Sequence, residues 1–215
     1  MNKLIIFDLD GTLIDSLPDI YEQVNITLKH FSYPTRTKAE IRQFIGNGAR
    51  NLIKKSFSDI DGQDLDEKLA YYNKIYTDCG SPKTCLFDGI RQVLLSLKEL
   101  GYKLAILTNK PQMTTEKVYE KYLKEFDFDV VIGQSNNVKC KPDKTATLSI
   151  LDKLGIEKED AYFIGDGETD FLTSKNAGIK SICVLWGYRD RCQLEEVGAK
   201  VFANCPQDIL KLIKP

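Results

Sequence analysis

The first hydrophobic run of the chain, residues 4–7, holds no polar residue and is followed by two aspartates, Asp8 and Asp10. An unbroken apolar run of this length is typical of a strand buried on both faces of a parallel sheet. Side chains alternate along a strand, so Asp8 and Asp10 leave on the same side if the chain stays extended. Burying charge is costly unless a metal or a partner compensates it, which favours a functional site over solvated acids at a strand end.

The next segment, residues 16–83, has helical spacing and no strand pattern. Ser16 can cap a helix, and Asp19 completes a capping-box-like pattern with it; Thr37 and Glu40 form a second capping box. Apolar residues then recur three or four positions apart, which predicts amphipathic helices. They are Ile20, Val24, Leu28, Phe31, Leu65, Leu69, Tyr72 and Tyr76. The segment is therefore expected to form a helical insert.

Beyond residue 86 the pattern alternates between helix and strand. Strands are predicted at residues 103–108, 129–132, 161–164 and 180–185. Helices are predicted from Asp88 to Gly101 and near residues 114–124, 144–154 and 169–177. Alternation of this kind predicts an α/β fold, in which a doubly wound parallel sheet carries helices on both faces.

Charge and cysteine usage exclude several function classes. The chain of 215 residues has 30 Lys and Arg against 31 Asp and Glu, a net charge of −1, which provides no electrostatic footprint for nucleic acid or an anionic membrane. The buried strand follows the N-terminus at once, so we expect no signal peptide, and no run is long enough to span a membrane. The six cysteines form no CxxC pair and indicate reduced thiols in a cytoplasmic protein.

Polar residues gather where the predicted strands end. In an open parallel sheet, ligands bind beyond the carboxyl ends of the strands, so these residues should share one rim. Carboxylates, a hydroxyl and an ammonium suit phosphoryl transfer through an aspartate, with a hard cation to neutralise phosphate oxygens. Oxygens of Asp8, Asp10 and Asp166 would suit Mg²⁺. The rim residues are Asp8, Asp10, Thr108, Asn109, Lys110, Lys141, Asp166 and Asp170.

Together these motifs resemble those of the haloacid dehalogenase-like hydrolase superfamily. The matching segments are Asp8-Leu9-Asp10-Gly11-Thr12, Thr108-Asn109-Lys110, Lys141-Pro142 and Gly165-Asp166 with Asp170. The resemblance implies a Rossmann-like core formed by residues 1–15 and 84–215, with a C1-type cap at residues 16–83. Three further segments resemble the phosphoglycolate phosphatase-like branch. They are Ile45-Gly46-Asn47-Gly48-Ala49-Arg50, Phe87-Asp88-Gly89 and Trp186-Gly187-Tyr188-Arg189.

The first two motifs carry the reacting groups in this resemblance. Asp8 would be the nucleophile that forms an aspartyl-phosphate. Asp10 would protonate the leaving alkoxide and later activate water, with its backbone carbonyl on Mg²⁺. Thr12 would help to hold Asp10, while Thr108 and the backbone amide of Asn109 would bind phosphoryl oxygens.

The remaining motifs supply charge and metal ligands. By the same resemblance, Lys141 would pair with the phosphate and with Asp8, and Asp166 would bind Mg²⁺. Asp170 would either bind the metal itself or hold one of the metal-binding residues in position. In the cap, Arg50 follows the glycines at the start of a helix and is a candidate to read an acidic substrate group, because Arg binds carboxylate and phosphate bidentately.

The resulting prediction is a Mg²⁺-dependent phosphatase for a small phosphorylated, phosphoglycolate-like metabolite, acting as a monomer or homodimer. A sugar phosphomutase of the β-phosphoglucomutase type remains an alternative, although Thr169 stands where some of those relatives carry an acid and Glu168 precedes it. A pyrophosphatase is a further alternative. The acid at Asp10 argues against dehalogenase chemistry, and the intact motifs argue against a binding module with an inactive site.

Overall fold

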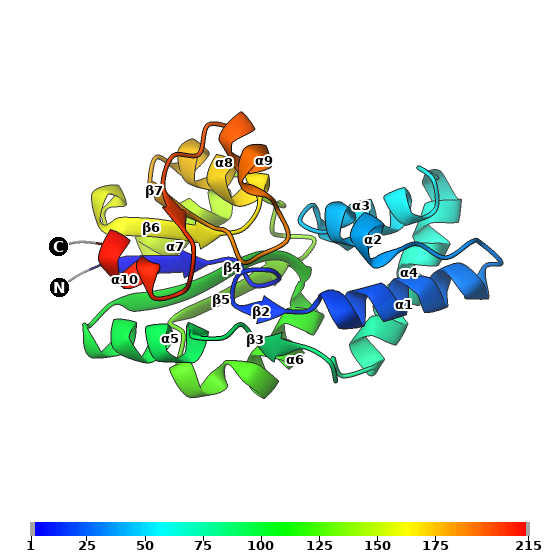
Figure 1. The fold of residues 1–215 in the computed structure, drawn as a ribbon, viewed down its shortest axis with the longest axis horizontal. Helices are drawn as coiled ribbons and strands as arrows, with labels where there is room; N and C mark the ends of the chain where they lie inside the picture. The colour runs from blue at the N-terminus through cyan, green and yellow to red at the C-terminus, as the bar shows by residue number, and fades with distance from the viewer. Residues whose placement is uncertain (1–2, 214–215) are drawn as a thin grey trace.

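The computed structural model describes residues 3–213, in which an α/β core carries a helical insert at one end (Figure 1). The core holds a six-stranded sheet in the order β5-β4-β1-β6-β7-β8, and all neighbouring strands are parallel. The strands are β1 (Leu4–Phe7), β4 (Lys103–Pro111), β5 (Val130–Gln134), β6 (Ala161–Gly165), β7 (Lys180–Val184) and β8 (Phe202–Ala203). The predicted Rossmann-like α/β architecture is confirmed.

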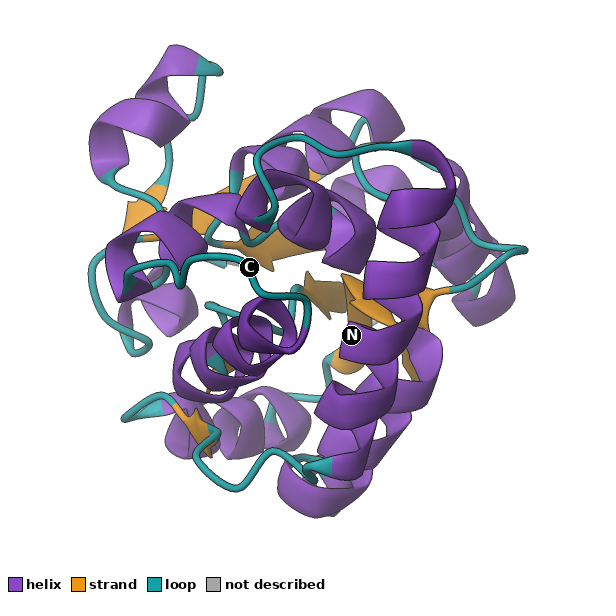
Figure 2. Ribbon diagram, turned by 90° about the vertical axis from the view of Figure 1, so that its right-hand side faces the viewer, coloured by secondary structure: helices purple, strands orange, loops and turns teal. Residues whose placement is uncertain are grey.

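Alternation along β1 builds the core on both faces of the sheet. Ile5 and Phe7 pack with helices α5, α6 and α10, whereas Leu4 and Ile6 pack with α7 and α8. Figure 2 shows helices on both sides of the strands. Their bounds are α5 (Ile90–Glu99), α6 (Gln112–Tyr122), α7 (Thr145–Leu154), α8 (Glu168–Ala177) and α10 (Asp208–Leu212). A strand covered on both sides needs apolar residues at every position, which explains the unbroken run in the sequence.

The path of the chain places the site beside β1. After β1 the chain adds β4 and β5 on one side of it, then crosses over to add β6, β7 and β8 on the other. The loops after β1 and β6 therefore diverge, and they leave a crevice at the carboxyl ends of these central strands. Residues at the carboxyl ends of β1, β4 and β6 meet at this rim.

The insert consists of four helices with their own apolar core. They are α1 (Leu17–His30), α2 (Lys38–Phe44), α3 (Gly48–Ser56) and α4 (Gly62–Asp78). Val24, Leu28, Ile53 and Phe57 are buried among them. The capping box of Thr37 and Glu40 forms as expected. In Figure 1 these helices lie beyond the right-hand ends of the strands of the core sheet.

Two short strands join the insert to the core. β2 (Ile14–Asp15) and β3 (Cys85–Leu86) pair antiparallel, so the outgoing and returning chains lie side by side. Asp19 accepts hydrogen bonds from the backbone N–H of Lys83 (3.0 Å) and the hydroxyl of Thr84 (2.7 Å). The expected capping role of Ser16 is wrong, because its hydroxyl makes no cap hydrogen bond and Asp19 ties the two crossings together instead.

Other differences from the expected elements are small. β4 runs on to Pro111, three residues past its predicted end, and β5 spans Val130–Gln134 where residues 129–132 were expected. Elements with little periodicity were not predicted from the sequence: β2, β3, β8, α9 (Arg191–Glu196), α10 and the short helices η1 (Lys124–Phe126) and η2 (Lys158–Asp160). Within residues 3–213, no helix is both long and apolar enough to cross a membrane.

Candidate active site

The turn after β1 presents the two aspartates. The backbone N–H of Asp8 still donates to Ile164 (2.9 Å), so Asp8 continues the strand beside β6. The chain then reverses through Gly11, whose φ of 86° is in the left-handed region that favours glycine. A side chain at Gly11 would also strike the Asp166 carboxylate, since its Cβ would lie 2.4 Å from Oδ2. This turn therefore depends on glycine where it passes close to the Asp166 carboxylate.

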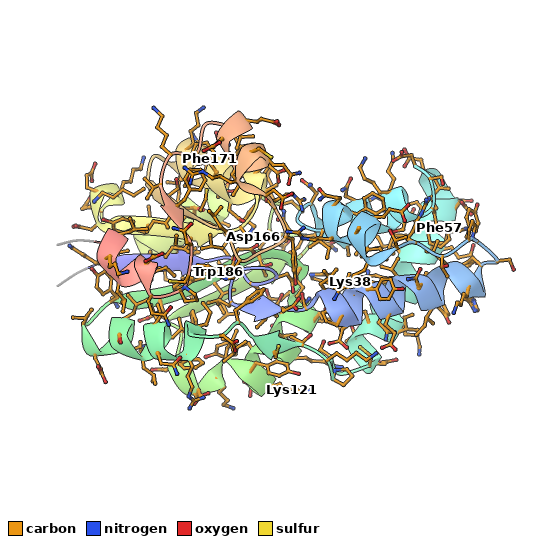
Figure 3. The ribbon with its side chains drawn as sticks, in the orientation of Figure 1. Lys38, Phe57, Lys121, Asp166, Phe171 and Trp186 are labelled. Carbon is orange, nitrogen blue, oxygen red and sulfur yellow. The ribbon has the colours of Figure 1, made fainter. Side chains whose placement is uncertain are left out.

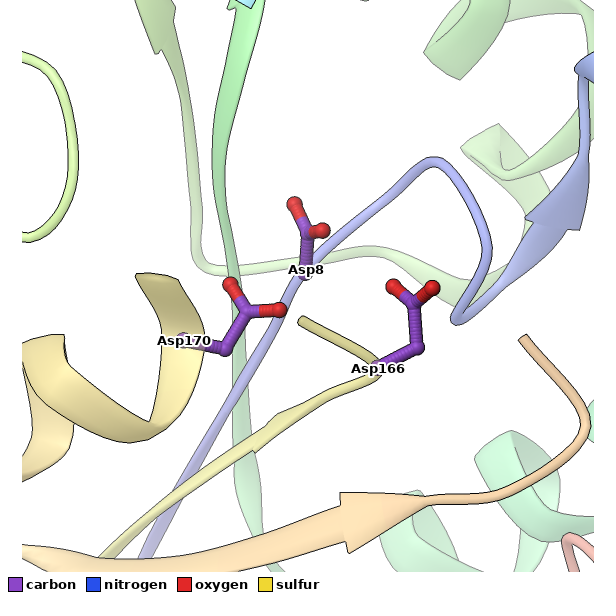
Figure 4. Close-up of side chains that lie close together, drawn as sticks. All are labelled: Asp8, Asp166 and Asp170. Carbon is purple, nitrogen blue, oxygen red and sulfur yellow. The ribbon is translucent and has the colours of Figure 1, made fainter. Parts of the chain in front are cut away.

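Three buried carboxylates form a cluster at this rim. Oxygens of Asp8, Asp166 and Asp170 lie within 4.8 Å of one another. Figure 4 shows them reaching the same space from the ends of β1 and β6 and from α8, and Figure 3 places Asp166 at the side of the core that faces the cap. Burial and the neighbouring negative charges raise the pKa of Asp8 to about 7 and that of Asp166 to about 8.

Lys141 provides the positive charge nearest to this cluster. It follows β5 in the loop before α7, and its Nζ lies 2.7 Å from Asp8 Oδ1 and 2.6 Å from Asp170 Oδ1. Burial alone would lower the pKa of Lys141, but the charges of Asp170 and Asp8 raise it above its usual value. Lys141 is therefore an ammonium held between two carboxylates, and the expected pairing with Asp8 is present.

Asp10 lies in a separate environment. Lys110 Nζ donates to its two oxygens at 2.9 and 3.1 Å and also to the hydroxyl of Tyr76 on α4 at 2.7 Å. The hydroxyl of Ser16 donates to Asp10 Oδ1 at 2.6 Å. The sequence places Lys110 in the motif at the end of β4, but it does not indicate the contacts that Lys110, Ser16 and Tyr76 make around Asp10.

Thr12 contacts a different acid from the expected one. Its hydroxyl donates to Asp166 Oδ1 at 3.2 Å, and the backbone N–H of Tyr188 donates to Asp166 Oδ2 at 2.7 Å. The expectation that Thr12 holds Asp10 is therefore wrong in this structure, because the turn at Gly11 directs Thr12 toward β6. Thr12 and Tyr188 orient Asp166.

Thr108 and Asn109 lie with Asp8 on the wall of a cavity between the core and the cap. Thr108 Oγ1 accepts a hydrogen bond from the backbone N–H of Lys110 at 3.2 Å. The side chain of Asn109 accepts from Lys141 N (2.7 Å) and donates to the carbonyl of Gly46 in the cap (2.9 Å). Asn109 therefore joins three segments that are far apart in the sequence.

A cavity lies between these residues and the cap. The core contributes Asp8, Asp10, Thr108, Asn109, Lys110 and Pro111 to its wall; the cap contributes Ile20, Ile45, Gly46, Gly48, Ala49, Leu52, Tyr72 and Tyr76. The structure does not bring Arg50 to this cavity. Its guanidinium pairs with Asp66 at 2.5 Å on the cap surface, where about half of the Arg50 side chain is exposed.

The carboxylate cluster fits a metal ion by the chemistry of its donors. Burial, and then repulsion from the neighbouring acids, raises the pKa values of Asp8 and Asp166, and a divalent cation would offset both costs. Both Asp170 oxygens accept hydrogen bonds, from Lys141 and from Gly167 N (2.9 Å). The Asp10 carboxylate lies outside this cluster and pairs with Lys110. The predicted ligand set of Asp8, Asp10 and Asp166, with Asp10 binding through its backbone carbonyl, stays a prediction.

Glu168, the acid considered for a mutase-like metal site, is directed away from the cluster. It accepts from Arg189 Nε at 2.9 Å, and this buried arginine also donates to the carbonyls of Arg42 (3.1 Å) and Ile45 (2.6 Å) at the end of α2. Glu168 therefore helps to join the core to the cap.

Comparison with known proteins agrees with this geometry. The family model of haloacid dehalogenase-like hydrolases matches residues 5–184. Phosphoglycolate phosphatase 1 of Pseudomonas aeruginosa is 32% identical over 97% of this chain and 78% of its own length. The phosphoglycolate phosphatase of Colwellia psychrerythraea is 34% identical over 86% of this chain and 85% of its own.

Solved structures show the same fold. A candidate phosphoglycolate phosphatase from Lactobacillus delbrueckii subsp. bulgaricus superposes with a TM-score of 0.90 at 26% identity, covering 99% of this chain and 98% of that one. A haloacid dehalogenase-like family hydrolase from Streptococcus pneumoniae gives a TM-score of 0.83 at 25% identity, with coverage of 99% and 98%. The chain therefore belongs to the haloacid dehalogenase-like hydrolase family, in its phosphoglycolate phosphatase-like branch.

Proposed function

We propose that this protein hydrolyses a phosphate monoester of a small metabolite through an aspartyl-phosphate on Asp8. The observation that carries the proposal is the separation of two neighbouring acids: Asp8 faces Lys141 and the carboxylate cluster, whereas Asp10 faces Lys110 and Ser16. Two acids in different environments can perform two different tasks in one reaction. The prediction of a phosphatase for a small phosphorylated metabolite is confirmed at family level by the curated relatives.

In the first step, an oxygen of Asp8 attacks the phosphorus and the bond between phosphorus and the ester oxygen breaks. Asp10, in its protonated form, gives its proton to the departing alkoxide, so that a neutral alcohol leaves. Lys141 offsets the repulsion between the Asp8 carboxylate and the phosphate, which would otherwise oppose the approach of two anions. Thr108 and the backbone amide of Asn109 bind phosphoryl oxygens.

In the second step, the Asp10 carboxylate takes a proton from water as the water oxygen attacks the phosphorus. The bond to Asp8 breaks, inorganic phosphate leaves, and Asp8 is again a carboxylate. Lys110 and Ser16 donate hydrogen bonds to Asp10 and so hold the side chain that acts as the base in this step. The same side chain can serve as acid and then base because the first step leaves it deprotonated.

We propose Mg²⁺ as the metal, held by Asp8 and Asp166 and by the backbone carbonyl of Asp10, with Asp170 as a support that positions Lys141. Carboxylate oxygens and few protein ligands suit Mg²⁺. When bound, this ion would neutralise negative charge on the phosphoryl group. Thr12 and the backbone of Tyr188 keep Asp166 aimed at the site.

The decisive experiment is a phosphate-release screen across phosphorylated metabolites with Mg²⁺, repeated with a chelator. Monoester hydrolysis that stops with chelator and returns with Mg²⁺ supports the proposal. Chelator-resistant hydrolysis would contradict the metal site. Interconversion of hexose 1- and 6-phosphates, or selective hydrolysis of pyrophosphate, would replace it with one of the alternative activities.

We further propose that residues 16–83 act as a cap that closes over the cavity, supported by their separate apolar core and by the paired crossings β2 and β3. A cytoplasmic location is supported by the six free cysteines. Gel filtration would distinguish the expected monomer from the expected homodimer.

A further inference from the structure

The part of the cavity wall that faces the phosphoryl site from the cap is apolar. α1, α3, α4 and the turn before α3 contribute Ile20, Ile45, Ala49, Leu52, Tyr72 and Tyr76. The core motifs can bind only the phosphoryl group, so this wall must accommodate the alcohol part of the substrate. The chemistry of these six residues therefore bears directly on which alcohol fits.

The positive charges near the cavity already have partners. Lys110 is the one cation on the described wall of the cavity, and its three donors engage both oxygens of Asp10 and the hydroxyl of Tyr76. Lys141 lies between Asp8 and Asp170. Arg50 and Arg189 pair with Asp66 and Glu168 outside this wall. A substrate carboxylate would thus enter the cavity without a free cation to meet it.

The cap is seated on the core in this structure, so the wall is that of the closed site. Asn109 Nδ2 donates to the carbonyl of Gly46, Lys110 Nζ donates to Tyr76, and Arg189 donates to the carbonyl of Ile45. These contacts hold the turn before α3 and the last turn of α4 against the core. Among the described residues of the cap, no lysine or arginine lines the cavity, so the apolar residues face it directly.

Two tyrosines make part of this wall flat. The rings of Tyr72 and Tyr76 stack with centroids 5.5 Å apart and an angle of 8° between their planes. Burial raises the pKa of both hydroxyls well above the usual value, so neither adds charge. A flat apolar wall favours contact with an aromatic ring or a branched alkyl group.

Resting on the proposed phosphatase activity, we propose that the preferred substrate is a monoester of an uncharged, largely apolar alcohol rather than of a carboxylate-bearing alcohol such as glycolate. An apolar alcohol would gain contact with Leu52, Ile20 and the tyrosine pair as it leaves water. A carboxylate there would lose its hydration without an ion pair in return. This chain would then differ in specificity from its phosphoglycolate phosphatase relatives.

The test compares kcat/KM for benzyl phosphate, 4-carboxybenzyl phosphate and 4-carbamoylbenzyl phosphate. The last two alcohols share a shape and differ in charge, so the carbamoyl ester, which should be the better substrate of these two, separates charge from size. We expect kcat/KM for benzyl phosphate to exceed that for 4-carboxybenzyl phosphate by about tenfold or more. An apolar pocket typically discriminates by this factor against a substrate with one unsuitable group. Phosphoglycolate should also be a poorer substrate than benzyl phosphate. Equal or greater kcat/KM for either acidic substrate would overturn the inference.

Variants connect that preference to the wall. Leu52→Ala should lower kcat/KM for benzyl phosphate about tenfold but change kcat/KM for methyl phosphate less than about twofold, because methyl phosphate does not reach Leu52. Leu28→Ala is the matched control, because Leu28 is buried in the cap without lining the cavity. It should affect both substrates equally. If Leu52→Ala does not fold, Leu52→Val takes its place in the same comparison of the two substrates.

Failure of the inference and failure of the proposed function can be told apart. Good hydrolysis of phosphoglycolate with poor hydrolysis of benzyl phosphate would refute the apolar specificity and leave the phosphatase intact. Equal losses of kcat/KM for benzyl phosphate and methyl phosphate in Leu52→Ala would likewise refute the apolar specificity. Absence of hydrolysis with every monoester would refute the phosphatase and, with it, the inference.

Discussion

Lys110 and Asp10 form a buried ion pair at the boundary between the core and the cap. The ammonium lies 2.9 and 3.1 Å from the two Asp10 oxygens, and the side chains are only 2% and 13% exposed. Lys110 also donates to Tyr76 of the cap at 2.7 Å. The proposed acid and base of the reaction is therefore held by a residue that contacts the cap directly, which makes its position dependent on cap closure.

Replacing Lys110 with the uncharged Lys110→Met should lower kcat by about 10²-fold, the lower part of the range that a positioned acid or base contributes. Asp10 would keep the Ser16 hydrogen bond but lose its cation. Steady-state kinetics with phosphate detection checks this result. Lys74→Met is the control, because Lys74 is exposed on the same helix as Tyr76 and pairs only with Asp78. A kcat within threefold of wild type in Lys110→Met would contradict the role.

The same pair has an effect on stability. Lys110→Met alone should lower the free energy of unfolding by about 3 kcal/mol, because it leaves a mostly buried carboxylate without its cation. Adding Asp10→Asn should recover most of that loss, since neither charge then remains. Urea denaturation of the two single variants and the double variant measures this coupling. Additive losses in the double variant would mean that the pair does not interact in solution.

Asp8→Asn should remove turnover while preserving the fold. A neutral amide cannot form the aspartyl-phosphate, so kcat/KM should fall by ~10⁴-fold or more, as when an enzyme loses its nucleophile. Lys141 keeps Asp170 as its partner, and removing one acid relieves repulsion within the cluster. Thermal denaturation should therefore give a Tm at or above that of wild type. Activity within tenfold of wild type would reject Asp8 as the nucleophile.

Metal binding should be visible without any activity measurement. Mg²⁺ at about a hundred times its Kd should stabilise the wild-type protein by about 2.7 kcal/mol, since it binds the folded state. Asp166→Asn should remove most of this response without lowering the Tm of the metal-free protein, because burial and then the charges of Asp170 and Asp8 disfavour the Asp166 carboxylate there. The exposed Asp152 on α7 provides the control Asp152→Asn. An unchanged Mg²⁺ response in Asp166→Asn would exclude Asp166 as a ligand.

The sequence could predict the core and the main acids because both follow from local patterns. A strand that is apolar at every position must be covered on both faces, and parallel topology brings the residues after such strands to one rim. Asp8, Lys141 and Asp166 meet there as expected. The short strands β2 and β3 have two residues each, which is too few to show a periodicity.

Contacts between distant segments could not be read from the sequence. Whether Thr12 reaches Asp10 or Asp166 depends on the direction of the Gly11 turn, and no residue pattern encodes that direction. The sequence does not distinguish an exposed arginine from a buried one. Arg50 pairs with Asp66 on the surface, whereas Arg189 is buried against the cap. Their roles depend on how the cap sits on the core.

Arg189 fastens the end of α2 to the core. It is 6% exposed, its Nε donates to Glu168, and its other nitrogens donate to the carbonyls of Arg42, Gln43 and Ile45. Carbonyls at a helix C-terminus lack intrahelical partners, and a cation beside them also interacts favourably with the helix dipole. Its neighbour Tyr188 binds Asp166 through its backbone, so one loop contacts both the proposed metal site and the cap.

Arg189→Met should therefore loosen the cap and lower the free energy of unfolding by about 2 kcal/mol, since the partly exposed Glu168 loses its partner and the α2 carbonyls lose their donors. Hydrogen exchange should become faster in α2 and stay unchanged in α7. The value of kcat/KM should fall because the closed site forms less often. Arg191→Met, which removes an exposed pair with Glu195, should change stability by no more than about 0.5 kcal/mol. Faster exchange across the whole core in Arg189→Met would show a general loss of stability instead of a released cap.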